Sequence, residues 1–179
     1  MGRVVFAGAM SHVLDPDYYE RACGAVGRRT VEAVMAEIAK MGERFSAKKA
    51  DALIVVADDH LNAFSFNAVP ALCVRIGRHV QRMVQDHAEA FDKVLDHMPE
   101  RYPLHEELAN SILEQGIQAG FDLALSWEAP VDHAFLSPVN TMHGTRPIPP
   151  LVPIRARPSR ARRQCAGRAV ARGLRCEPG

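Results

Sequence analysis

The sequence predicts an α/β protein with a mostly parallel central sheet flanked by helices. Three apolar runs, at 3–10, 51–57 and 121–127, have the composition of strands buried in a sheet. Stretches with apolar residues at helical spacing lie between them. Strands that alternate with helices indicate parallel pairing through right-handed crossovers. A chain of 179 residues is long enough for one domain with its own core.

The first elements follow from the N-terminal third. RVVFAGAM, residues 3–10, predicts a buried strand. Asp15 is suited to cap a helix that begins with Pro16. Apolar residues at helical spacing extend this helix to about Phe45; they are Ala22, Val26, Val34, Ile38 and Met41. The strand DALIVVA, residues 51–57, then completes a β-α-β unit.

The later elements are less regular. Residues 63–77 predict a loop with at most an edge strand, because Pro70 is unsuited to a central strand. A helix is predicted from the spacing of Val80, Val84, Phe91, Val94 and Met98. Another is predicted from Leu104, Leu108 and Ile112, and Pro103 is its expected first residue. Residues 121–127 are the third strand, and 149–154 open a fourth.

Composition limits the class of protein. The apolar fraction is 47% and the charged fraction 24%, as in soluble globular proteins, and no apolar run is long enough for a membrane span. The N-terminus does not resemble a secretory signal, so we expect a cytoplasmic protein. The cysteines show neither CxxC spacing nor the density of a disulfide scaffold, so we expect reduced thiols at Cys23, Cys73, Cys165 and Cys176.

The charge is unevenly distributed along the chain. Residues 155–179 contain eight Arg and one acid, Glu177, which gives 8 − 1 = +7, whereas the net charge of the whole chain is only +1. Residues 1–154 therefore carry 1 − 7 = −6. Three interpretations remain open for the Arg-rich segment: an arm for nucleic acid or an anionic surface, a disordered extension, or a C-terminus read out of frame. Nucleic acid is the weakest of them, because no aromatic residues are interleaved with the arginines.

Three of the eight histidines directly follow predicted strands. They are His12, His60 and His133. Because the carboxyl ends of parallel strands share one edge of a sheet, these side chains could meet in one pocket. The alternative is three loop histidines that never meet. The remaining histidines fit surface, helix-turn or loop positions and need no function; they are His79, His87, His97, His105 and His143.

Two imidazoles and a carboxylate with open coordination positions form the facial arrangement of non-haem iron enzymes that use dioxygen. The same spacing also permits zinc with a bound water. Asp58 and Asp59 could support His60 from outside the metal shell, or could simply cap the turn. Asp132 could orient the neighbouring His133.

Three segments together resemble the class III extradiol ring-cleavage dioxygenases, the family of the protocatechuate 4,5-dioxygenase β subunit and 2,3-dihydroxyphenylpropionate dioxygenase. The matching segments occur in the family's order; they are AGAMSHVL, DALIVVADDHLNAFSFNAVPALCVRIG and FDLALSWEAPVDHAFLSPV. The resemblance implies cleavage of a catechol-type ring with O2, in the catabolism of aromatic compounds. It also implies that His12 and His60 bind Fe(II), and that His133 lies beside the substrate as an acid or base or as a residue that interacts with oxygen.

The resemblance ends near residue 154. Members of that family continue well beyond this point, and their continuation holds the glutamate that completes the iron site and a further active-site histidine. We therefore expect residues 1–154 to be the N-terminal part of a catalytic domain that is incomplete at its C-terminus, with weakened iron binding and activity. Two alternatives from other classes are a non-catalytic α/β subunit that assembles with a full-length partner and an α/β domain whose basic tail binds nucleic acid.

Overall fold

A computed structural model of the chain describes residues 2–12, 14–58, 60, 63–65, 67–83 and 98–156. Its helices are α1 (Pro16–Ser46), α3 (Glu106–Gln118) and α4 (His133–His143). Its strands are β1 (Leu53–Ala57), β2 (Leu72–Ile76), β3 (His79–Gln81), β4 (Arg101–Pro103), β5 (Leu123–Trp127) and β6 (Leu151–Ala156). No helix in these described ranges is both long and apolar enough to cross a membrane.

Four strands form a mixed sheet in the order β1-β6-β2-β5, and β3 pairs with β4 in a separate two-stranded sheet. β1 runs parallel to β6, with Leu53 opposite Leu151, and β2 runs parallel to β5. β6 and β2 are antiparallel, with Cys73 opposite Arg155. The predicted fold class, a mostly parallel sheet flanked by helices, is confirmed, but one antiparallel pairing divides the sheet into two parallel halves.

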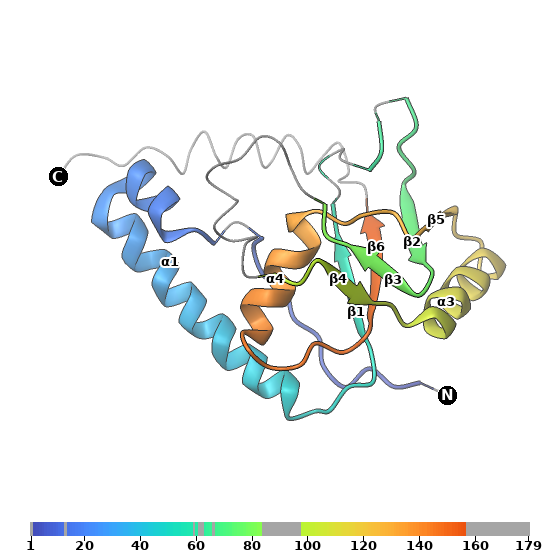
Figure 1. The fold of residues 1–179 in the computed structure, drawn as a ribbon, viewed down its shortest axis with the longest axis horizontal. Helices are drawn as coiled ribbons and strands as arrows, with labels where there is room; N and C mark the ends of the chain where they lie inside the picture. Colours follow the sequence, from blue (N-terminus) through green and yellow to red (C-terminus); the bar gives the residue numbers. More distant parts are fainter. Residues whose placement is uncertain are drawn as a thin grey trace.

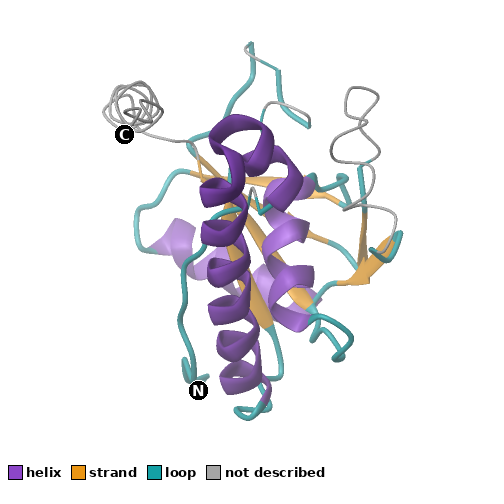
Figure 2. Ribbon diagram, turned by 90° about the vertical axis from the view of Figure 1, so that its left-hand side faces the viewer, coloured by secondary structure: helices purple, strands orange, loops and turns teal. Residues whose placement is uncertain are grey.

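Helices cover both faces of the sheet. Figure 1 shows α4 and α1 on one side and α3 on the other. On the α4 side, Phe135, Leu136 and Val139 pack with Leu151 and with Tyr102 of β4. On the α3 side, Ala109 and Leu113 pack on the strand residues Val74, Ile76 and Val152. Figure 2 shows α1 lying across the front of this layered structure, beside α4.

The start of α1 matches the prediction. Asp15 accepts hydrogen bonds from the amides of Asp17 and Tyr18, and Pro16 is the first helical residue, where its missing N–H is not needed. The helix is kinked at Gly24, whose φ of +63° favours glycine. Arg28 forms ion pairs with Asp17 and Glu20 before the kink and with Glu32 after it, so it links the two parts.

The predicted first strand is wrong. Residues 3–10 are all described, yet they form a loop that belongs to neither sheet, so the expected β-α-β unit lacks its first strand. Side chains hold the segment instead of a backbone ladder. Phe6 and Met10 pack beside the cluster formed by Ile38, Phe45 and Met142. Consequently β1, predicted as a buried strand that completes a β-α-β unit, is at the edge of the sheet.

The segment 63–77, predicted as a loop with at most an edge strand, contains a central strand of the sheet. β2 is not an edge strand; it lies between β6 and β5. Pro70 is compatible with this position because it precedes the strand and therefore removes no hydrogen bond from the ladder. Its carbonyl accepts a hydrogen bond from Arg155 Nη1 at 2.6 Å.

Two helix predictions need revision. Val80 does not begin a helix; it is a buried residue of β3, and residues 84–97 of that predicted helix lie outside the described part of the chain. Pro103 does not begin α3 either, because it ends β4. The cap of α3 is His105, whose Nδ1 accepts the amide hydrogen of Leu108.

The strand predicted from 149–154 is confirmed as β6 and continues for two residues beyond the expected end. Arg155, the first arginine of the Arg-rich segment, is thus a buried strand residue. Residues 157–179, including Cys165, Cys176 and Glu177, lie outside the described residues. Among the cysteines that are described, Cys23 and Cys73 form no disulfide.

Candidate metal centre

The three histidines that follow predicted strands come together in space. The nitrogen atoms that His12, His60 and His133 can offer to a metal all lie within 4.8 Å of one another. The rings of His60 and His133 are stacked, with centroids 4.8 Å apart and planes 7° from parallel. The ring of His12 is tilted against both, at 4.8 Å from His60 and 5.4 Å from His133. A metal ion within this space could contact all three imidazoles.

Each histidine reaches the cluster from a different element. His12 ends the N-terminal segment shortly before α1, and His60 follows the end of β1. His60 has a φ of +45°, a left-handed conformation that costs a non-glycine residue of order 1–3 kcal/mol. His133 is the first residue of α4.

The predicted reason for this convergence, parallel strands that end at one edge of the sheet, is wrong for His12, because residues 3–10 form no strand, and it is wrong for His133 as well. β5 is antiparallel to β1, so the two strands end at opposite edges of the sheet. After β5, residues 128–132 run beside the end of β3, where the Val131 amide donates to the Gln81 carbonyl at 3.0 Å and the Met83 amide donates to the Val131 carbonyl at 2.9 Å. This return segment, and not the strand end itself, brings His133 next to His60.

Asp132 holds two parts of the cluster in place. Its Oδ1 accepts the amide hydrogen of Ala134 at 3.0 Å, which caps α4 where His133 begins it. Its Oδ2 lies 2.9 Å from Nδ1 of His60. Asp132 was predicted to orient its neighbour His133; its carboxylate raises the pKa of His133 against the larger lowering by burial, and it also contacts His60, 72 residues earlier. A carboxylate on Nδ1 favours the proton there and leaves Nε2 of His60 available as an electron-pair donor.

The environment favours neutral imidazoles. Burial lowers the pKa of His12, and the nearby His60 and His133 lower it further against the opposing effect of Asp132 and Asp58. Burial also lowers the pKa of His133, although the adjacent Asp132 opposes this change. Because only a neutral imidazole can donate an electron pair to a metal, the lowered pKa values suit metal binding near neutral pH.

Asp58, predicted to support His60, forms an ion pair with a residue of the neighbouring strand β6. Its Oδ1 is 3.3 Å from Nη2 of Arg155, across from β1 on β6. The guanidinium of Arg155 also lies 5.3 Å from the ring centroid of Phe64, and that of Arg75 lies 5.9 Å from it. These contacts of Arg155 were not predicted, because nothing in the local pattern around it distinguishes a strand residue from a basic tail. Asp59, the other predicted support of His60, lies outside the described residues.

The other histidines do not join the cluster where the structure describes them. His79 is exposed on β3, His105 caps α3, and His143 is buried at the far end of α4. His87 and His97 lie outside the described residues. The grouping thus agrees with the three positions singled out from the sequence, whereas the individual roles of these residues remain predictions.

Comparison with known proteins gives one family and a set of relatives. Residues 5–175 match the family "Catalytic LigB subunit of aromatic ring-opening dioxygenase", and this match extends past residue 154. The chain is similar to 2,3-dihydroxyphenylpropionate/2,3-dihydroxicinnamic acid 1,2-dioxygenase of Klebsiella pneumoniae (strain 342), at 29% identity over 65% of the chain and 34% of the relative. It is 26% identical to the protein of the same name from Escherichia coli (strain SMS-3-5 / SECEC), over 71% of the chain and 37% of the relative. The chain therefore spans about a third of the length of the curated relatives it matches.

Proposed function

Since the chain belongs to the family of the catalytic LigB subunit of aromatic ring-opening dioxygenases, we propose that it is a non-haem Fe(II)-dependent extradiol dioxygenase that cleaves a catechol-type ring with O2. The observation that carries this proposal is the meeting of His12, His60 and His133 from three separate elements. Family membership supports the reaction class, and the cluster supports the place where it occurs.

The donor set suits a divalent transition metal. Imidazole nitrogen is a good ligand for iron and zinc, and the lowered pKa values of His12 and His133 keep both side chains neutral. The contact between Asp132 and His60 is the kind of outer contact that fixes the ring of a metal-binding histidine. Both oxygen atoms of Asp132 already have partners, which makes it a positioning residue and not a ligand.

We assign the roles as follows. His12 and His60 hold Fe(II), and His133 transfers protons to and from the substrate. The Nδ1 of His133 is buried, so Nε2 is the ring nitrogen that can exchange a proton with a catechol hydroxyl. A neutral imidazole of lowered pKa accepts that proton near neutral pH and can return it to the product.

The reaction consumes one O2 for each ring. One carbon–carbon bond beside the diol breaks, and both oxygen atoms enter the product, so no external reductant is required. The bound ferrous ion supplies the chemistry of bringing the deprotonated diol and O2 together and letting electrons pass from ring to oxygen. The protein's own residues orient the metal, transfer the protons and hold the ring away from bulk water.

The test is reconstitution of the full chain with Fe(II) without oxygen, followed by addition of catechol and O2. We expect one O2 consumed per ring, and both atoms of ¹⁸O2 in the ring-opened product. The matched variants are His60→Ala, which should abolish uptake, and His79→Ala, which removes an exposed histidine outside the cluster and should not. A chain that binds Fe(II) at the cluster but consumes no O2 with any catechol would contradict catalysis by this chain, and a size measurement with a full-length relative would then test a subunit role.

A further inference from the structure

A largely apolar cavity adjoins the candidate metal centre. It has a volume of about 450 Å³ and lies between the N-terminal segment, β1, α1 and α4. Among the described residues that line it, the polar side chains are His12, which belongs to the histidine cluster, and Asp58, which interacts with His12. The rest of the lining is apolar and includes Phe6, Phe45, Val55, Val139 and Met142.

The cavity follows β1 along its length. Leu53 and Ala57, at the two ends of that strand, both line it, and the strand spans roughly 13 Å at about 3.3 Å per residue. Asp58 follows at the end nearest the histidines. The cavity therefore extends away from the metal cluster, with its polar groups at one end.

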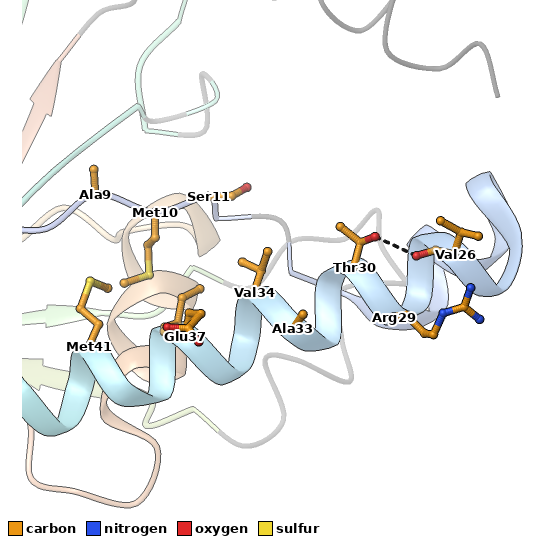
Figure 3. A pocket seen from close by; sticks show the side chains of 11 residues that line it. Ala9, Met10, Ser11, Val26, Arg29, Thr30, Ala33, Val34, Glu37 and Met41 are labelled. Atoms are coloured by element: carbon orange, nitrogen blue, oxygen red, sulfur yellow. Dashed lines mark hydrogen bonds between the residues drawn. The ribbon is translucent and has the colours of Figure 1, made fainter. Parts of the chain in front are cut away.

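A surface groove adjoins the cavity. Figure 3 shows this groove between residues 9–11 and one face of α1, with Met10 directed toward Met41. Ala9, Met10 and Met41 line both the groove and the cavity. Thioether side chains are flexible and adapt to ligands of different shape, so Met10 and Met41 can give way to an entering group.

The chemistry of the lining selects the ligand. Protein interiors are packed with few voids larger than a water molecule, and apolar walls favour the burial of apolar groups over polar ones. A carboxylate placed among Phe6, Phe45 and Met142 would lose its hydration without gaining a partner in that lining. An uncharged hydrocarbon group would bury its surface there without such a penalty.

We propose that this cavity binds the apolar substituent of the substrate, so that the preferred substrate is a catechol with an uncharged alkyl or aryl group at the carbon next to the diol. The inference rests on the proposed function for the position of the diol at His12, His60 and His133. The names of the curated relatives refer to a phenylpropionate, whose side chain ends in a carboxylate. The present chain should discriminate against that charged end.

A matched pair of ligands tests the inference directly. 3-Propylcatechol and 3-(2,3-dihydroxyphenyl)propionate differ only at the end of the side chain, where a methyl group replaces a carboxylate. Binding is measured by calorimetry on the full chain, both without metal and with Zn²⁺, which does not react with O2. We expect 3-propylcatechol to bind roughly tenfold to fiftyfold tighter than catechol, from about 0.8 kcal/mol per buried CH₂, and the propionate to lose that advantage.

Methionine methyl groups report where the ligand sits. In a chain labelled with [¹³C-methyl]methionine, 3-propylcatechol should shift the signals of Met10, Met41 and Met142, which line the cavity. Met98 is buried but does not line the cavity, so its signal should shift less than those of the three lining methionines. This measurement requires neither metal nor turnover, so it is independent of the proposed activity.

A cavity-filling variant completes the test. Val55→Phe places a larger ring in the cavity wall and should lower the affinity for 3-propylcatechol more than the affinity for catechol, which removes the preference for the propyl group. Leu125→Phe is the control, because it makes a similar change on the exposed side of β5. If Val55→Phe fails to fold, the methyl shifts in the unaltered chain still decide the question.

The outcomes separate the two proposals. Binding of 3-propylcatechol with the expected methyl shifts, but without O2 uptake by the Fe(II)-loaded chain, supports the cavity and contradicts the activity. Ring cleavage without a preference for the propyl group, or without shifts at Met10, Met41 and Met142, overturns the cavity assignment. The same holds if residues 3–10 close onto β1 as a strand in solution, seen as slow exchange of the β1 edge amides, because the cavity would then be absent.

Discussion

Helix α4 carries a histidine at each end, and the two side chains contact different groups. His133, at the start, lies against His12 and His60 with Asp132 beside it. His143, at the end, lies against the ring of Phe45, and its Nδ1 is 3.0 Å from the carbonyl oxygen of Pro147. Burial is the main cause of a lowered pKa in both.

The comparison shows that a shifted pKa does not by itself identify a functional site. Both imidazoles are neutral for the same reason, removal from water. His133 differs because nitrogen atoms of His12 and His60 that could bind a metal lie within 4.8 Å of its own. His143 instead contacts the carbonyl oxygen of Pro147 and packs against the ring of Phe45, which are contacts typical of a structural histidine in a core.

The largest expected effect comes from removing a ligand of the cluster. His60→Ala should weaken the binding of a divalent metal by roughly a hundredfold or more, because loss of a direct ligand exceeds the tenfold to hundredfold effect of an outer contact. Metal titration monitored by Co²⁺ absorption measures this. The same titration on His143→Ala should match the unaltered chain, and an equal loss in both variants would end the distinction between the two ends of α4.

The second prediction concerns His143 itself. His143→Ala removes a side chain that is only 2% exposed and should lower the free energy of unfolding by about 2 kcal/mol, because it leaves a cavity beside Phe45 and an unpaired carbonyl at Pro147. Urea denaturation of the metal-free chain gives this value. No loss of stability would show that the packing at this end of the helix is unimportant.

The third prediction tests whether Asp132 positions His60 for metal binding. Asp132→Asn keeps a good helix cap but removes the charge that holds Nδ1 of His60, so metal affinity should fall roughly tenfold with little loss of stability. The matched control is Asp15→Asn, the same change at the cap of α1, which should leave metal affinity unchanged. Equal metal binding by the Asp132→Asn variant would contradict a positioning role.

The smallest effect is a pH dependence. Because the folded-state pKa values of His12, His133 and His143 lie below the ordinary 6.5, the unfolded chain binds more protons just below that pH. The contribution of these three histidines to the free energy of unfolding is therefore complete above pH 6.5, and it is lost as the pH falls toward their lowered pKa values. Denaturation measured from about pH 8 to about pH 5 should show that the free energy of unfolding decreases as the pH falls. The decrease should be steeper with metal bound, because protons compete with the metal for the histidines of the cluster, to which His143 does not belong.

Local features were predictable where the cause was local. The capping of α1 by Asp15, the strands β1, β5 and β6, and the α/β class all follow from side-chain types and their spacing over a few residues. Predictions failed where a strand needed a partner. The composition of residues 3–10 is that of a strand, but the segment has no ladder, whereas β2, preceded by Pro70, became central.

The candidate site residues were identifiable from residue types and order alone: three histidines next to apolar runs, each of a type that binds metal near neutral pH. Whether they meet, and by which route, depends on the tertiary fold. Because β2 pairs antiparallel with β6, β5 ends at the edge of the sheet opposite the end of β1. Residues 128–132 then run back along β3 and bring His133 to the other histidines. Strand direction depends on backbone hydrogen bonds between segments far apart in the chain, and no local pattern of side chains specifies those bonds.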